Sequence, residues 1–226
     1  MSVIVALIST LDGVVASDGR IFGTARLEGG RVVTPALVES EAFDKTFVLA
    51  GGKLVGAFAG LMRFSGKTVA EHVAEAADAL AVQESSLDAF VSHLASEIST
   101  RLEAVDANEV TPASRKLDML LVAGAHFTRA DMRIVSLSLR PQADRIVAET
   151  NTVWADRRRN QYYVHGEDRA RAAAVMTLDS NRAPNRDVPF LKKLSLRAVQ
   201  AGIAAAGVNP HGTERACGGQ TFWRHT

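Results

Sequence analysis

The 226-residue chain has little of what several large classes of protein site require. Its single cysteine, Cys217, excludes a disulfide framework within the chain and leaves too few thiols for a structural zinc site. A formal net charge of +1 argues against nucleic acid or an anionic membrane as the main partner. The apolar N-terminus lacks a basic leader, and no apolar run approaches the roughly 20 residues that cross a bilayer. We therefore expect a cytoplasmic protein that binds no metal, cofactor, nucleic acid or membrane.

Apolar patterning predicts strands in two groups and one short C-terminal piece. The first group consists of two hairpins near the N-terminus. Between them, the apolar residues of segment 21–44 show no sustained period, and we expect only a short strand there. Loops of this length inside compact domains are usually functional. The predicted strands are residues 3–7, 14–17, 31–34, 46–49, 54–58, 117–125, 132–139, 145–149 and 220–224.

Apolar residues at helical spacing predict two pairs of helices, and Ser86 is the expected N-cap of the second helix. Strands and helices follow one another in runs instead of alternating as βαβ units would. This order favours an α+β fold with mostly antiparallel sheets covered by helix pairs. We expect residues 1–226 to form a single domain with an insertion near residues 21–44. The predicted helices are residues 68–80, 86–105, a stretch after Gly166, and residues 187–206.

Ser2 is chemically the most informative residue because it stands at the start of the first predicted strand. Removal of Met1 would leave Ser2 with a hydroxyl and a free α-amine, which is a nucleophile with its own base. The amine can accept the hydroxyl proton because its unperturbed pKa is roughly 7.7–8.0. A nearby ammonium would lower that pKa further, and a carboxylate would keep the ammonium charged when it is partly buried. Lys45 and Asp18 are the candidates for these two roles.

Five segments point to a known family. They are Ser2-Val3-Ile4-Val5, Asp12-Gly13-Val14-Val15-Ala16-Ser17-Asp18-Gly19-Arg20, Gly56-Ala57-Phe58-Ala59-Gly60, Val164-His165-Gly166 and Glu214-Arg215-Ala216-Cys217-Gly218-Gly219. These segments resemble the proteasome β-subunit family, including the peptidase subunit of the bacterial heat-shock-locus protease. They occur in the same order as in that family, and the match extends over nearly the whole chain. That family belongs to the N-terminal-nucleophile hydrolases. The resemblance implies a four-layer αββα sandwich and a self-compartmentalising homo-oligomeric ring that hydrolyses polypeptides with an ATPase unfoldase as partner.

The resemblance also implies a role for each matched residue. Ser2 would be the nucleophile and its amine the base, while Asp18 would hold Lys45 beside that amine. The backbone N–H of Ala57 would stabilise the oxyanion. Serine replaces the family's usual threonine. The amine would be oriented by Glu214, Cys217 and His165, which stand where the family has an aspartate and two serines.

The catalytic interpretation requires one register of the first hairpin. A tight turn at Asp12-Gly13 would place Asp18 across from Leu7, five residues from the nucleophile. A five-residue link over residues 8–12 instead places Asp18 opposite Ser2, and we expect this second register.

Two alternative functions stay open, and a third is set aside. The same fold could serve as a catalytically silent ring subunit with Met1 retained, or as an N-terminal-nucleophile amidase acting on small amides. Residues 60–68, which end in Gly66-Lys67-Thr68, also lie between a strand and a helix, as a phosphate-binding loop does. However, five residues separate Gly60 from Gly66 where that motif allows four. We therefore interpret this segment as the entry to a helix.

Overall fold

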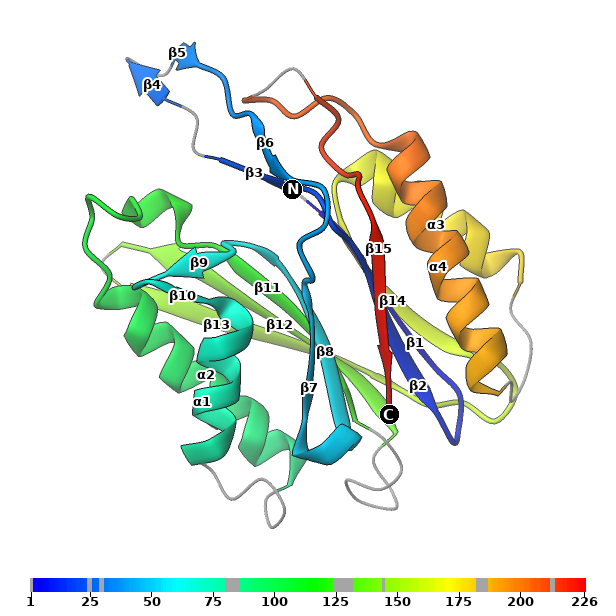
Figure 1. The fold of residues 1–226 in the computed structure, drawn as a ribbon. Helices are drawn as coiled ribbons and strands as arrows, with labels where there is room; N and C mark the ends of the chain where they lie inside the picture. Colours follow the sequence, from blue (N-terminus) through cyan, green and yellow to red (C-terminus); the bar gives the residue numbers. More distant parts are fainter. Residues whose placement is uncertain are drawn as a thin grey trace.

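The computed structural model describes residues 2–23, 26–28, 31–79, 86–123, 132–143, 145–181, 187–211 and 214–226 (Figure 1). Its strands are β1 (Val3–Ile8), β2 (Gly13–Asp18), β3 (Ile21–Phe22), β4 (Arg26–Glu28), β5 (Arg31–Thr34), β6 (Val38–Ser40), β7 (Thr46–Leu49), β8 (Leu54–Gly60), β9 (Arg63–Phe64), β10 (Lys67–Thr68), β11 (Leu117–Ala123), β12 (Arg133–Gln142), β13 (Arg145–Trp154), β14 (Gln161–Gly166) and β15 (Thr221–His225). Its helices are α1 (Val69–Ala79), α2 (Leu87–Glu103), α3 (Asp168–Asp179) and α4 (Val188–Ala205), with short 3-10 turns η1 (Ala50–Gly52) and η2 (Pro112–Ser114). The paired strands run antiparallel, in agreement with the predicted α+β class.

The four-stranded sheet has the order β14-β1-β2-β15 and presents Ser2 at the start of β1. All six residues of β1 are buried, because one face packs under α3 and α4 while the other faces the second sheet. A strand covered on both faces is apolar throughout, which explains why Val3–Ile8 lacks polar alternation. The predicted C-terminal strand is confirmed as β15, which pairs with β2.

The first hairpin has a register one residue away from the expected one. The link between β1 and β2 spans four residues, 9–12, and the Ser9 hydroxyl closes it by accepting two backbone N–H groups from the turn. Continued by one residue, the register places Asp18 opposite Val3 instead of Ser2, so the predicted five-residue link is wrong. The shift keeps Asp18 at the same end of the sheet as Ser2.

The five-stranded sheet has the order β13-β12-β11-β8-β7 and confirms the remaining long strands that the sequence predicted. Strand β12 extends further than expected, to Gln142, which pairs with Arg145, and β13 extends further, to Trp154, which pairs with Arg133. Residues 141 and 142 of the predicted turn are therefore part of β12, and Ala143 has a φ of 52°, which suits a tight turn. Asp144, the last residue of the predicted turn, lies outside the described residues. Residues 124 and 125, the predicted end of β11, also lie outside them.

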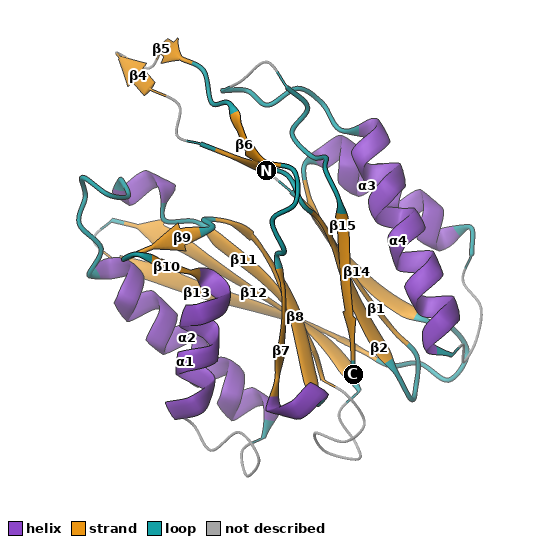
Figure 2. Cartoon of the chain, viewed as in Figure 1, coloured by secondary structure: helices purple, strands orange, loops and turns teal. Residues whose placement is uncertain are grey.

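Two helix pairs cover the outer faces of the two sheets, as the ribbon colours of Figure 2 show. One buried cluster joins α1 and α2 to the five-stranded sheet, and a second joins α3 and α4 to the four-stranded sheet. A third cluster lies between the sheets and contains Ile4, Ala57 and Leu120. The start of β1 therefore lies between the two sheets, where residues from both of them can meet.

The predicted helices are confirmed, with ends set by local capping. Ser86 caps α2 by accepting the Ala89 N–H at 3.2 Å. The stretch after Gly166 is α3, and residues 187–206 contain α4, which Asp187 caps. Leu80, the predicted last residue of the first helix, lies outside the described residues.

The segment before α1 has no phosphate-loop geometry. It forms a small hairpin of β9 and β10, and Thr68 and Glu71 then make reciprocal hydrogen bonds that cap α1. Lys67, the residue that would reach a phosphate, is paired with Glu75 on the helix surface. The structure thus agrees with the interpretation of this segment as a helix entry.

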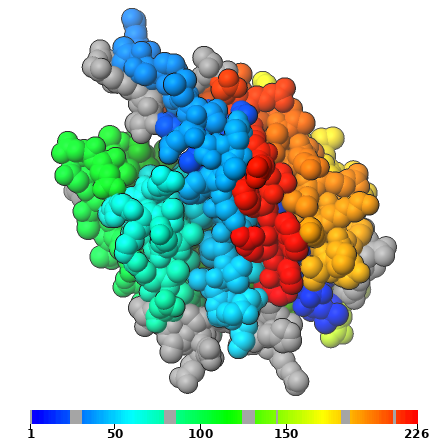
Figure 3. Space-filling model, in the orientation of Figure 1, coloured from blue at the N-terminus to red at the C-terminus, as the bar shows by residue number. Residues whose placement is uncertain are grey.

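The insertion at residues 21–44 contains more structure than predicted. The expected strand at residues 31–34 is β5, and it pairs with β4, while β3 pairs with β6 nearer the body of the molecule. The β4–β5 hairpin extends away from the two sheets, as the blue segment of Figures 1 and 3 shows. Every residue of β5 is exposed.

Strand β14 was not predicted. It pairs with β1 along its full length and brings His165 opposite Ile4. Its residues are mostly half-buried because it forms the edge of the four-stranded sheet, so the sequence carries weak polar alternation there. Among the described helices none combines the length and apolar character needed to span a membrane.

Candidate active site

Ser2 contacts a buried cation at the edge of the two sheets. The Lys45 Nζ atom donates to Ser2 Oγ at 2.8 Å, to Asp18 Oδ1 at 3.0 Å and to the backbone carbonyl of Arg20 at 2.7 Å. An ammonium has three protons, and these three acceptors use all of them. Lys45 and Asp18 are fully buried, and Ser2 is 3% exposed. The structure therefore brings together the three residues at the centre of the predicted site.

Asp18 is held by the backbone on both sides of the site. Its Oδ1 atom also accepts the Val3 N–H at 2.9 Å, and its Oδ2 atom accepts the Gly218 N–H at 3.1 Å. These bonds tie the end of β2 to the start of β1 and to the segment before β15. A carboxylate fixed in this way keeps the Lys45 ammonium in one position relative to Ser2.

Burial lowers the pKa of Lys45, because transfer from water penalises the charged ammonium, while the nearby Asp18 carboxylate opposes this shift. The opposing effects leave a lysine that is paired but less basic than one in water. Such a group can stabilise negative charge on a neighbouring oxygen and can exchange a proton more readily than an exposed lysine.

Met1 lies outside the described residues, so the position of the amine that its removal would expose is not part of the observed geometry. The hydroxyl of Ser2 is placed, and its backbone is closely packed. A Cβ atom added at Gly166 would come within 2.6 Å of the Ser2 carbonyl oxygen, so glycine allows β14 to approach the start of β1.

His165 lies in the same pocket as Ser2. This pocket, of about 250 Å³, is lined by residues of both sheets and by the N-terminus of α3. The His165 Nε2 atom is 3.1 Å from Asp118 Oδ2. The lining residues are Ser2, Ala59, Gly60, Lys116, Asp118, Arg140, His165, Gly166 and Glu167.

Cys217 is buried beside the ion pair, one residue before the glycine that donates to Asp18. Burial raises the pKa of the Cys217 thiol to about 12; the Asp18 carboxylate adds to this shift and the Lys45 ammonium opposes it. The thiol is therefore neutral at physiological pH and is suited to packing against the site instead of nucleophilic attack.

This burial predicts that Cys217 will resist alkylation in the folded protein. Iodoacetamide at pH 8 should leave the native mass unchanged for hours, because the thiolate is the reacting species and the sulfur is covered. The same reagent should add one carbamidomethyl group after denaturation in guanidinium. Mass spectrometry of both samples measures this, and rapid modification of the native protein would show that the thiol is ionised or accessible.

Two predicted site residues are not placed beside Ser2. Glu214 is exposed, and the contact that the structure gives it is made by its carbonyl oxygen, which accepts the Asn209 N–H. Ala57 lies inside β8, between Thr46 of β7 and Leu120 of β11.

The direction of the Ala57 N–H follows from the neighbouring residue. The Phe58 N–H donates to the Lys45 carbonyl oxygen at 3.0 Å, on the β7 side of the strand. Because successive residues of an antiparallel strand direct their N–H groups to opposite sides, the Ala57 N–H points toward β11. It is thus part of the sheet ladder and does not face Ser2.

Two carboxylates near Ser2 were missed by the sequence reasoning. Asp118 is a lone acid within the apolar strand Leu117–Ala123, and this isolated charge was a usable signal. Glu167 caps α3 by accepting the Ala170 N–H at 2.9 Å and lines the Ser2 pocket. Neither residue belongs to a motif that the family resemblance highlighted.

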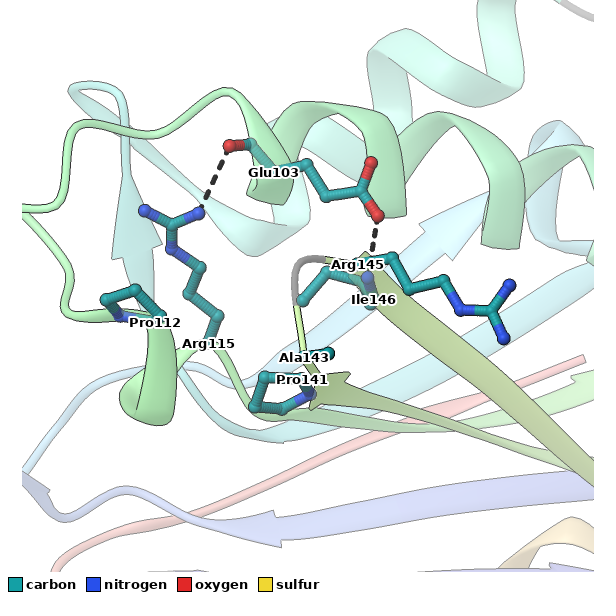
Figure 4. Close-up of a pocket in the computed structure, with 7 residues that line it drawn as sticks. All are labelled: Glu103, Pro112, Arg115, Pro141, Ala143, Arg145 and Ile146. Carbon is teal, nitrogen blue, oxygen red and sulfur yellow. Dashed lines mark hydrogen bonds between the residues drawn. The ribbon is translucent and has the colours of Figure 1, made fainter.

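A second pocket, shown in Figure 4, lies between the end of α2 and the β12–β13 turn and has a volume of about 200 Å³. Two of its polar lining residues make hydrogen bonds within the protein. Arg115 donates to the Glu103 carbonyl, and the Glu103 carboxylate accepts the Ile146 N–H, as the dashed lines of Figure 4 show. These bonds attach the end of α2 to the sheet, so the pocket is a structural junction.

No protein-family model matches the chain, and a search of curated proteins finds no match. Within the part of the chain that the structure describes, no three His, Cys, Asp or Glu side chains gather in a way that could hold a metal ion. The geometry around Ser2 is therefore the main basis for a functional interpretation.

Proposed function

We propose that this chain is a proteasome-like peptidase subunit, an N-terminal-nucleophile hydrolase that cleaves peptide bonds through an acyl-enzyme on Ser2. The observation that carries the proposal is the 2.8 Å contact between Ser2 Oγ and the buried Lys45 Nζ, with Asp18 behind it. A fully buried lysine with a carboxylate on one side and a hydroxyl on the other is costly to place in a protein interior. Such an arrangement is typical of a catalytic site.

The arrangement of buried clusters supports the same assignment. Helix pairs outside two sheets, with an apolar layer between the sheets, are what the four-layer αββα sandwich of N-terminal-nucleophile hydrolases requires. The first strand of that fold begins at the nucleophile. Here β1 begins at Val3, one residue after Ser2.

In the proposed reaction, Met1 is removed and the Ser2 α-amine becomes the base. The amine takes the hydroxyl proton while Oγ attacks the substrate carbonyl, and the Lys45 ammonium keeps the amine unprotonated by opposing a second positive charge. The proton then passes to the leaving amine, and water releases the acyl group. Since the Ala57 N–H points toward β11, the proposal assigns no backbone oxyanion donor.

A polypeptide suits the surface around Ser2 better than a small amide does. A pocket of about 280 Å³ lies beside the Ser2 pocket, and Gly60 lines both of them. The insertion contributes Ile21 and Phe22 to this second pocket. Two adjoining pockets can hold side chains on either side of a scissile bond. Assembly into a cytoplasmic ring, with an ATPase unfoldase supplying unfolded chains, is proposed from the family resemblance.

Intact mass spectrometry tests the proposal together with hydrolysis of an unfolded protein. We expect the purified protein to lack Met1 and to degrade fluorescein-labelled casein, and we expect Ser2→Ala to remove that activity with no change in folding. A protein that retains Met1 and leaves casein intact would instead be the silent ring subunit. A protein that lacks Met1 and cleaves only small amides would be the amidase.

A further inference from the structure

A histidine and a carboxylate outside the Ser2–Lys45 contact form an oriented pair in the same pocket. His165 belongs to β14 and Asp118 to β11, so their 3.1 Å contact joins the two sheets. Asp118 Oδ1 accepts from Ser138 Oγ at 2.6 Å and from Arg140, which leaves Oδ2 for the histidine. The carboxylate is thus fixed from β12 and directed at one nitrogen of the imidazole.

These contacts determine which nitrogen of His165 is free. Burial alone would raise the pKa of Asp118, but its bonds with His165, Ser138 and Arg140 outweigh burial and hold that pKa below its usual range. Asp118 is therefore an anion at neutral pH and can only accept a hydrogen bond. The Nε2 atom of His165 must then carry a proton, and in the neutral imidazole Nδ1 is left with its lone pair.

The sheet register brings this imidazole near the Ser2 hydroxyl. His165 lies opposite Ile4, so it is a diagonal neighbour of Ser2 on the adjacent strand, and Ser2 and Ile4 lie on the same face of β1. Diagonal neighbours have Cα atoms roughly 7–8 Å apart, a distance that long side chains can span. Both residues line the one pocket, whose volume of about 250 Å³ has room for a bridging water molecule.

We propose that His165, oriented by Asp118, is a second general base for Ser2 that does not require the free α-amine. This inference rests on the proposed role of Ser2 as the nucleophile and adds a base to the same site. An imidazole held in one tautomer by a buried carboxylate is the arrangement by which serine hydrolases of several unrelated folds activate their hydroxyl.

The reaction through His165 balances in protons and electron pairs. Nδ1 takes the Ser2 hydroxyl proton, directly or through the bridging water, as Oγ forms a bond to the substrate carbonyl carbon and the C=O π pair moves to oxygen. Collapse of this intermediate breaks the C–N bond, and the leaving amine takes the proton from the imidazolium. Water then repeats the sequence on the ester, releasing a carboxylic acid and restoring the Ser2 hydroxyl and the neutral imidazole.

Charged groups from several elements surround His165. Asp118 contacts it from β11, Arg140 stands behind that carboxylate on β12, and Lys116 and Glu167 complete the charged lining of the pocket. Protonation of His165 would remove the lone pair that accepts the serine proton. Hydrolysis that depends on this base should therefore fall as the pH is lowered.

The experiment separates the two bases by blocking the amine. An added glutamate between Met1 and Ser2 prevents removal of Met1, because methionine removal requires a small following residue, and mass spectrometry checks that the block is complete. We expect the blocked full-length protein to hydrolyse labelled casein measurably, with a rate that falls on acidification. His165→Gln in the blocked protein should lower kcat by about 10²-fold, a typical contribution of a general base. The same substitution in the unblocked protein should cost only a few-fold.

Glutamine is the chosen replacement because its amide can still donate to Asp118 but cannot act as a base. Circular dichroism of the blocked and the unblocked His165→Gln proteins checks the fold. If the unblocked protein is active and the blocked one is not, His165 is not a second base, while the proposed function stands. If the blocked protein is active and His165→Gln leaves its kcat and pH profile unchanged, this inference is also wrong. If neither form hydrolyses casein, both the proposed function and the second base are rejected.

Discussion

Replacing Lys45 by methionine will reduce peptide hydrolysis by about 10²–10⁴-fold, the range observed when a group that supports proton transfer is lost. Methionine fills much of the volume of the lysine stem but removes the ammonium that contacts Ser2 Oγ at 2.8 Å. Without that charge the Ser2 amine will bind a proton more tightly and will be a poorer base at neutral pH. Loss of the buried counterion of Asp18 should lower the stability of the variant. Asp18 keeps its two backbone donors, Val3 and Gly218, so we expect the variant to fold.

The measurement is kcat for casein or a derived peptide as a function of pH, together with circular dichroism. We expect the residual activity of Lys45→Met to require a higher pH than that of the unmodified protein. Lys45→Arg is the matched control: it retains a charge, but a planar guanidinium cannot reproduce three bonds directed from one nitrogen. It should therefore remain folded and stay well below the original rate. Full activity in Lys45→Met would show that the lysine does not take part.

Replacing Asp18 by alanine will lower the free energy of unfolding by about 3–5 kcal/mol, the usual cost of removing one partner of a buried ion pair. Lys45 is fully buried and would then have only the Ser2 hydroxyl and the Arg20 carbonyl to compensate its charge. The backbone N–H groups of Val3 and Gly218 would also lose their acceptor. A loss of this size is a large part of the stability of a typical domain.

Urea denaturation followed by circular dichroism measures this change. The matched variant is Asp18→Asn combined with Lys45→Met, which removes both charges while an amide oxygen still accepts one N–H bond. We expect the double variant to be more stable than Asp18→Ala and to be inactive, which separates the structural role of the pair from its chemical role. An Asp18→Ala protein within about 1 kcal/mol of the original would mean that the pair is solvated in solution and is not the buried contact described above.

Much of the fold follows from local sequence patterns. Apolar runs such as Val3–Ile8 and helical spacing with a serine cap at Ser86 are determined by residues close in sequence. Strand β14 was missed because an edge strand buries only part of each side chain, and its pairing with β1 depends on residues about 160 positions away. The predicted register of the first hairpin was wrong by one residue, because hydrogen bonds to the Ser9 hydroxyl fix the turn at four residues.

The candidate site could be predicted where it depends on motif spacing. Ser2, Asp18 and Lys45 come together as expected. The exposure of Glu214 and the contact between Asp118 and His165 were not predicted. The environment of these side chains depends on how the two sheets pack. Such contacts between sheets leave no periodic signal in the sequence.

The proposed mechanism requires Ser2 to present both a reactive hydroxyl and a free amine. A peptide epoxyketone has two electrophilic carbons and can bond to both groups of one N-terminal residue, so it tests them together. After incubation with this reagent, tryptic digestion and tandem mass spectrometry should find the peptide from Ser2 to Arg20 without Met1 and carrying the reagent's mass on Ser2. An unmodified N-terminal peptide that begins with Met1, or modification at another residue only, would contradict the proposed mechanism.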